Sequence, residues 1–125
     1  MGRCSYDQTS AVQIRGYYQV NLDEYSLMNA LMTGPVAILL NTGPPMSKGF
    51  RFYSDGVYEN QYSCQQLTNP VLDTNERHWV TVVGYDQNWW KVKNSWGPSW
   101  GEGGYFYLSK NAINVGCIIS ASYPY

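Results

Sequence analysis

The most informative segment of the sequence is Asn94-Ser95-Trp96-Gly97-Pro98-Ser99-Trp100-Gly101-Glu102-Gly103-Gly104-Tyr105. Its two Trp-Gly pairs and its Gly-Gly-Tyr ending describe a glycine-rich aromatic turn, which could serve as a platform for stacking sugars. The segment could equally hold the Asn94 amide against one imidazole nitrogen, fixing the tautomer of a histidine under a Trp lid. Because no nucleophile completes such a set, spacing alone does not choose between these two interpretations.

The only histidine of the chain, His78, lies upstream of this segment. We expect it where a polar loop, Glu59–Arg77, enters a strand over Trp79–Tyr85. Such a junction would hold a general base rigidly and leave it reachable. A single histidine is nevertheless more often structural than catalytic, so His78 alone does not establish an enzyme.

Short β-type runs separated by glycines and prolines surround these two features. They are Val36–Leu40, Phe50–Tyr53, Gly56–Tyr58, Trp79–Tyr85, Trp89–Lys93, Gly104–Leu108 and Ile118–Ser122. Their hairpin-like intervals, including the tight link over 86–88, predict an antiparallel, barrel-like sheet. Residues 1–20 are expected to be extended, with Val12, Ile14 and Val20 spaced as in a strand.

One helix is predicted near residues 22–33. Asn21 can cap it, with Glu24 three residues later as in a capping box and Asp23 at the positive helix end. Apolar residues then recur at helical spacing until Gly34-Pro35 ends the run. They are Leu27, Met28, Leu31 and Met32. The pattern therefore predicts an α+β fold, mainly antiparallel β, with one short helix packed on the core.

The composition supports a single domain over residues 1–125 and excludes several function classes. Hydrophobic residues make up 44% of the 125 residues, which is too many for a disordered chain. Charged residues make up 14% and the net charge is −1, so no basic excess is present to bind nucleic acid. The longest apolar run, Pro35–Leu40, is far too short to span a membrane.

The three cysteines are Cys4, Cys64 and Cys117, spaced too widely for CxxC zinc or redox chemistry. With a single histidine in the chain, we expect no metal site and no cofactor. From the residues alone, the cysteines are either three buried thiols or one disulfide plus one cysteine meant for a partner outside this chain.

The segment 94–105 resembles the C-terminal signature of the papain-like cysteine peptidases. Other parts of the chain resemble the same family in the same order, and most closely its cathepsin L-like branch. They are Gly34-Pro35-Val36, Phe52–Tyr58, His78–Tyr85 and Ala121–Pro124. The resemblance implies the barrel-like C-terminal lobe of the papain fold. In a complete thiol protease, this lobe would help a thiolate–imidazolium pair to hydrolyse peptide bonds.

The resemblance also implies roles for single residues. His78 matches the catalytic base, Asn94 the residue that orients it, and Trp96 the indole that shields their hydrogen bond. The positions that line the main substrate pocket of the family are Leu39, Trp79 and Ser120 here.

The cysteines match the family as well. Cys64 and Cys117 are similar to the disulfide within this lobe, and Cys4 is similar to a half-cystine whose mate lies in the other lobe. Cys117 is two residues closer to Tyr123-Pro124 than the family spacing, and Val115-Gly116 stands where Cys-Gly is usual. We therefore expect a Cys64–Cys117 bridge in which Cys117 is displaced by two residues from the usual position in the family.

Three departures from the family pattern change the interpretation. No Gln-x-Gly-x-Cys-Gly-x-Cys-Trp segment is present, so the N-terminal lobe with its nucleophile and oxyanion glutamine is absent, and we expect this chain alone to be inactive. Arg77 replaces an acid that often precedes the histidine. Trp79 replaces a small residue and is expected to crowd the pocket.

Two other function classes remain open. One is a catalytically inactive papain-like remnant that acts as a binding or assembly module, and the other is an aromatic-rich carbohydrate-binding module. The partners expected are the N-terminal peptidase lobe or a second copy of the chain, with a peptide or protein substrate in the complete enzyme. The family and the expected disulfide imply a lysosomal or secreted, extracellular location, although this chain shows no export signal.

Overall fold

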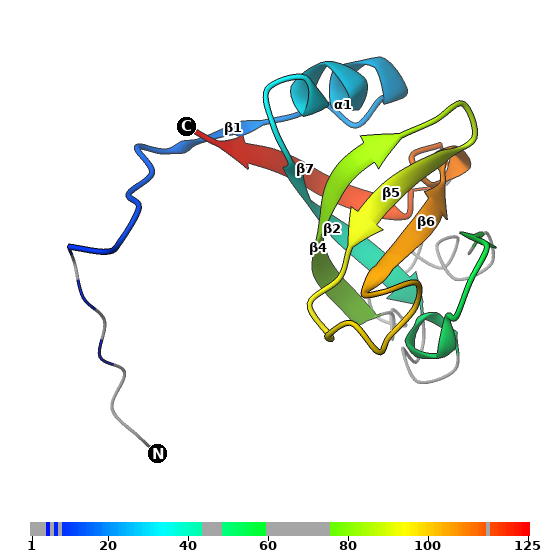
Figure 1. Ribbon diagram of the computed structural model, residues 1–125. Helices are drawn as coiled ribbons and strands as arrows, with labels where there is room; N and C mark the ends of the chain where they lie inside the picture. The colour runs from blue at the N-terminus through cyan, green and yellow to red at the C-terminus, as the bar shows by residue number, and fades with distance from the viewer. Residues whose placement is uncertain (1–4, 6, 8, 44–48, 60–75, 115) are drawn as a thin grey trace.

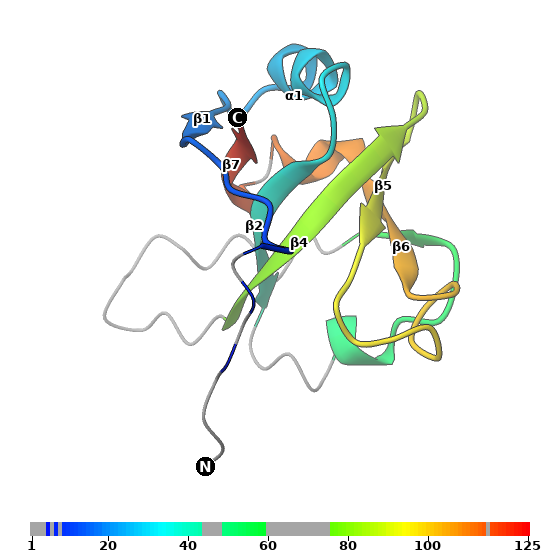
Figure 2. The same cartoon turned by 60° about the vertical axis from the view of Figure 1, so that its left-hand side comes forward.

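The computed structural model describes residues 5, 7, 9–43, 49–59, 76–114 and 116–125. These residues form one helix and a twisted sheet that wraps partly around the core (Figures 1 and 2). The elements are β1 (Tyr17–Gln19), α1 (Glu24–Leu31), β2 (Val36–Gly43), β3 (Val57–Tyr58), β4 (Glu76–Tyr85), β5 (Trp89–Lys93), β6 (Tyr105–Ser109) and β7 (Ile118–Pro124), with 3₁₀ turns at Phe50–Phe52 and Lys110–Ala112.

The described strands form one sheet of seven in the order β1-β7-β2-β4-β5-β6-β3. All neighbouring pairs are antiparallel except β3 and β6, which run parallel. The expected fold, one short helix with a mainly antiparallel sheet, is therefore confirmed.

The centre of the sheet is the pair β2 and β4, whose register runs from Val36 opposite Val82 to Leu40 opposite His78. Alternate side chains of a strand point to opposite faces. One face of these strands is therefore buried, and α1 packs near the end of the sheet where β4 finishes (Figure 1). The largest fully buried side chains include Trp90, Phe50, Phe106, Leu27, Ile38, Leu40 and Leu108.

The helix cap lies two residues later than expected. Asp23, not Asn21, is the N-cap, and its carboxylate accepts hydrogen bonds from the Ser26 backbone N–H at 2.8 Å and the Ser26 hydroxyl at 2.7 Å. These bonds hold the pKa of Asp23 below its usual range. The prediction of Asn21 was wrong because Asp23 has the extended backbone of a cap, directly before the first helical residue.

Two expected strands are also corrected. Phe50–Phe52 forms a 3₁₀ turn that buries Phe50 in an aromatic cluster while Phe52 stays exposed, so the segment does not continue as a strand. Val12 and Ile14 are exposed and lie outside any strand, because the backbone hydrogen bonds of this segment to the end of the chain extend only to Arg15 and Gly16, which bond Tyr125.

Lys110 joins the helix to the sheet. Its Nζ lies 3.0 Å from Oε1 of Glu24 in α1, 4.8 Å from the ring centroid of Tyr85 and 5.0 Å from that of Trp90. The Lys110 side chain is only 10% exposed, whereas that of Glu24 is 56% exposed. A cation against aromatic faces is worth more once it is desolvated, so the two ring contacts are expected to outweigh the ion pair.

We expect Lys110→Ala to lower the free energy of unfolding by about 2 kcal/mol, because it removes both ring contacts and the buried stem. Glu24→Gln removes only the half-exposed ion pair and should lower it by less than about 1 kcal/mol. Urea denaturation measures both values, with the exposed Lys93→Ala as the matched control. Equal losses for the two variants would show that the aromatic contacts add nothing.

Candidate active site

His78 and Asn94 come together because β4 and β5 are antiparallel neighbours. His78 is the third residue of β4, and Asn94 follows β5 directly. Their side chains meet with 2.8 Å between His78 Nε2 and Asn94 Oδ1. His78 therefore lies inside a strand rather than at the expected loop junction, since β4 already begins at Glu76.

The orientation of the Asn94 amide decides which nitrogen of His78 carries a proton. Asn94 Oδ1 also accepts the backbone N–H of Ser95 at 2.8 Å. A backbone N–H can only donate, so the atom that it reaches must be the amide oxygen. Since that oxygen can only accept, His78 Nε2 must be the donor. In the neutral imidazole, the lone pair is then left on Nδ1.

Aromatic rings surround this pair. The Trp96 indole stacks on the His78 ring with 4.9 Å between centroids and an interplanar angle of 29°. Phe50 contacts both His78 and Trp96. The cluster continues through Tyr53, Tyr58, Trp100 and Phe106. Burial raises the pKa of Tyr58 to about 12, so its hydroxyl stays neutral at physiological pH.

The turn that carries Asn94 depends on two glycines. Gly101 has φ +57°, and a Cβ there would lie 2.6 Å from the Tyr105 carbonyl oxygen. Gly104 has φ +94°, and a Cβ there would lie 3.2 Å from the Gly97 carbonyl oxygen. The Gly104 carbonyl accepts the Asn94 backbone N–H at 3.0 Å. Both positions of the sequence motif therefore require glycine, because a side chain would be strained at these φ values and would crowd a carbonyl oxygen.

Asn94 is also enclosed by protein. The residue is 7% exposed, and its Nδ2 is buried without a hydrogen-bond partner among the described residues. A buried amide with an unpaired donor is costly, which makes the two bonds to Oδ1 more important for holding it.

The three expected pocket residues lie at one level of the sheet. Leu39 in β2 pairs with Trp79 on one side and with Ser120 in β7 on the other. Trp79 and Ser120 line a hollow of about 310 Å³ together with Tyr17, Gln19 and Ser122. Trp79 is 53% exposed and does not fill this hollow. Because His78 and Trp79 are consecutive in a strand, their side chains point to opposite faces.

Of the three cysteines, only Cys117 lies within the residues that the structure describes. Cys117 is buried directly before β7 and is disulfide-bonded. Cys4 and Cys64 lie outside the described residues, so the Cys64–Cys117 pairing stays a prediction. Arg77, next to His78, is exposed.

In the part of the chain that the structure describes, no group of three or more His, Cys, Asp or Glu side chains could hold a metal ion. No helix there has the length and apolar character needed to cross a membrane.

Comparisons with known proteins agree with this geometry. Residues 1–125 match the family described as papain family cysteine protease. Vignain from Vigna mungo is 33% identical over 98% of this chain and 34% of its own length. Mexicain from Jacaratia mexicana is 37% identical over 87% of the chain and 46% of its own length.

A solved structure is similar as well. The digestive procathepsin L2 proteinase from Tenebrio molitor larval midgut is 36% identical, with a TM-score of 0.70, over 98% of this chain and 38% of its own. The chain thus spans between a third and a half of the length of these relatives.

We expect the Nε2 proton of His78 to give an observable ¹H–¹⁵N signal in the neutral imidazole, because a partly buried hydrogen bond slows its exchange with water. Asn94→Ala should remove that signal, whereas Ser95→Ala, which keeps the backbone N–H, should retain it. NMR of the ¹⁵N-labelled chain is unambiguous, since only one histidine is present. A proton found on Nδ1 instead would contradict the tautomer assignment.

Proposed function

The chain belongs to the papain family of cysteine proteases, and we propose that it is the lobe carrying the catalytic His78 and Asn94 of a cysteine endopeptidase. The observation that carries the proposal is the 2.8 Å bond from His78 Nε2 to an Asn94 oxygen whose orientation Ser95 fixes. Since the chain spans only part of its relatives, the nucleophilic cysteine would come from the remaining part, the N-terminal lobe.

In the complete enzyme, His78 Nδ1 would take the proton of that cysteine thiol. The resulting thiolate would attack the carbonyl carbon of a peptide bond, and Nδ1–H would then protonate the leaving amine as the C–N bond breaks. Water would hydrolyse the acyl-enzyme, with Nδ1 accepting its proton. Throughout, Nε2–H would stay bonded to Asn94, which keeps the working nitrogen facing the reacting atoms.

The surroundings of the pair suit this role. Trp96 covers the imidazole, and Asn94 is almost fully buried, so water has little access to the bond between them. An interaction between an imidazolium and an amide oxygen is stronger where water is excluded. We therefore assign Trp96 a shielding role.

We also propose that Leu39, Trp79 and Ser120 belong to the substrate pocket. The support is the hollow of about 310 Å³ beside Trp79 and Ser120, with Leu39 paired to both in the sheet. An exposed indole on one wall would favour the apolar side chain of a peptide substrate.

The chain is proposed to be one domain over residues 1–125 that associates with the N-terminal lobe or with a second copy. Large apolar side chains on its surface, including Trp79, Val83 and Phe52, support such association. A lysosomal or extracellular location is favoured by the disulfide at Cys117, because disulfides persist in oxidising compartments.

A second candidate function is an inactive papain-like module for binding or assembly. Trp79 favours it, because a large exposed indole stands where the family pattern has a small residue. The two candidates differ in one respect that can be measured, namely whether adding a nucleophile lobe produces hydrolysis.

We expect the purified chain to neither hydrolyse dipeptidyl substrates of cathepsins nor react with an epoxide thiol inhibitor. Adding a cysteine-bearing N-terminal lobe should produce activity that His78→Ala lowers by at least about 10³-fold. The exposed Gln87→Ala serves as the control and should leave activity unchanged. Inhibitor-sensitive hydrolysis by the chain alone would refute the division of catalytic residues between lobes. A folded two-lobe complex without activity would favour the inactive module.

We expect one reactive thiol per monomer when thiols are counted under denaturing, non-reducing conditions, with Cys4 labelled and the Cys64–Cys117 bridge intact. That bridge would close a loop of about fifty residues and stabilise the fold by roughly 4 kcal/mol on the chain-entropy view. Peptide mapping of the labelled protein identifies the cysteine. Three reactive thiols, or a label on Cys64, would contradict the pairing.

A further inference from the structure

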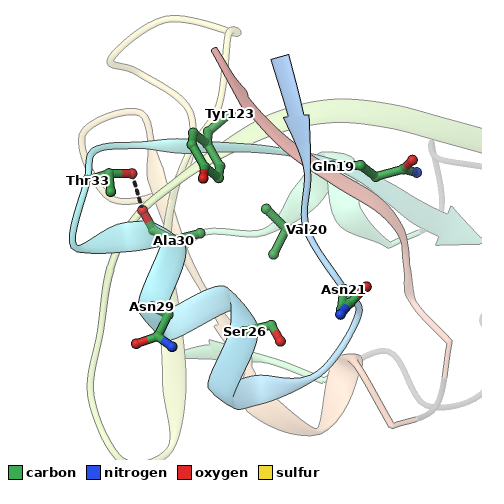
Figure 3. A pocket seen from close by; sticks show the side chains of 8 residues that line it. All are labelled: Gln19, Val20, Asn21, Ser26, Asn29, Ala30, Thr33 and Tyr123. Atoms are coloured by element: carbon green, nitrogen blue, oxygen red, sulfur yellow. Dashed lines mark hydrogen bonds between the residues drawn. The ribbon is translucent and has the colours of Figure 1, made fainter. Parts of the chain in front are cut away.

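A second hollow lies between α1 and the edge of the sheet (Figure 3). It has a volume of about 290 Å³. Its walls come from the end of β1 and the residues after it, from α1 and its exit, and from the end of β7. The lining residues are Gln19, Val20, Asn21, Ser26, Asn29, Ala30, Thr33 and Tyr123.

This hollow is separate from the His78–Asn94 pair, although Gln19 lines both this hollow and the one beside Trp79. His78 lies near the start of β4, opposite Leu40, whereas α1 leads into Val36, at the opposite end of β2. Figure 1 shows α1 at the end of the sheet where β4 finishes. None of the lining residues belongs to the His78–Asn94 pair or to its aromatic cluster.

The walls carry neutral polar groups and no acidic or basic side chain. The Ser26 hydroxyl donates to Asp23 Oδ2 at 2.7 Å, and the Thr33 hydroxyl donates to the Ala30 carbonyl at 2.7 Å. Each hydroxyl has a single proton, so both present only lone pairs to a ligand. They are therefore acceptors that are already oriented, and a ligand must supply the donors.

Two side-chain amides can form further hydrogen bonds with a ligand. The side chains of Asn21 and Asn29 show no hydrogen bond among the described residues, and each amide offers one acceptor oxygen and two N–H donors. In Figure 3 they lie on opposite sides of the hollow, one on the segment after β1 and one on α1. The Gln19 amide points away from the other lining side chains (Figure 3), so Asn21 and Asn29 are the amides that a ligand in the hollow would meet.

The remaining wall is apolar. It consists of Val20, Ala30 and the ring of Tyr123, which extends from β7 toward the helix (Figure 3). No lining side chain carries a charge that could compensate a charged ligand for lost hydration, and the nearby Asp23 carboxylate already binds Ser26. A wholly apolar ligand would leave the amides and hydroxyls unpaired. The ligand that fits is neutral, has several O–H donors and also has one apolar face.

We propose that this hollow binds a neutral sugar ring. Sugar hydroxyls would donate to Ser26 and Thr33 and exchange hydrogen bonds with the two asparagines, while the C–H face would lie against Tyr123 and Val20. The volume of about 290 Å³ lies just below the range usual for small-molecule sites, roughly 300–1,000 Å³, so the hollow holds one ring rather than a long chain.

The test is an NMR titration of the full 125-residue chain. The probes are methyl α-mannoside, N-acetylglucosamine and maltose as free sugars, and a neutral mannose-terminated glycopeptide as the attached form. At least one probe should give saturable shifts centred on the backbone amides of Val20, Asn29 and Ala30. Binding of the glycopeptide alone would identify a protein-linked glycan as the source, and binding of a free sugar would identify the free form.

Asn29→Ala should weaken the binding about fivefold, because it removes one amide. Alanine favours a helix, so this variant should fold, and Asn21→Ala provides a second test outside the helix. Asn88→Ala, in the distant turn between β4 and β5, is the matched control and should bind like the original chain.

Three outcomes would overturn the proposal. They are no saturable shift with any sugar, saturation by the peptide analogue N-acetylglycinamide in place of sugars, and sugar binding that neither asparagine substitution weakens.

Discussion

The hydrogen bond from the Ser95 backbone N–H to Asn94 Oδ1 is the interaction on which the proposed chemistry of this chain depends. A backbone N–H has no alternative role, so it determines which end of the amide faces His78. That orientation makes Nε2 the donor and leaves Nδ1 as the basic nitrogen. The bond is local, between adjacent residues, yet it sets the protonation of a side chain sixteen positions away.

The rest of the structure holds Asn94 and Ser95 in place. Gly101 and Gly104 allow the turn to fold back so that the Gly104 carbonyl receives the Asn94 backbone N–H. The pairing of β4 with β5 brings His78 to the same place, and Phe50 with Trp96 fills the space around the imidazole. The sheet register, the glycine turn and the aromatic cluster thus all help to position the side chains of His78 and Asn94.

Part of this arrangement could be predicted from the sequence. Alternating and β-branched runs indicated the central strands, and helical spacing indicated α1. The cap was misplaced because Asn21 and Asp23 are both good cap residues, and only the backbone conformation separates them. Phe50 was assigned to a strand because its burial in a ring cluster is a tertiary effect that no local pattern contains.

For the site, the family resemblance named His78, Asn94 and Trp96, but residue spacing alone did not. The tight link over 86–88 indicates a hairpin between the flanking strands, and this sequence signal could have placed His78 beside Asn94. The role of the Ser95 backbone N–H was missed, since every residue except proline carries one. The hollow beside α1 was missed too, because its walls come from three segments that are distant in the sequence.

The opposite orientations of His78 and Trp79 have a consequence for how such a protein can diversify. The His78 ring faces the aromatic cluster, where any change disturbs many neighbours, while the adjacent Trp79 indole faces a half-open hollow where it has few neighbours. Selection can therefore alter residue 79 and its neighbours across the sheet without moving His78, the residue proposed to transfer protons. One face of β4 therefore holds His78 in a constrained environment, while the other face carries Trp79, which can be replaced with little effect on its surroundings.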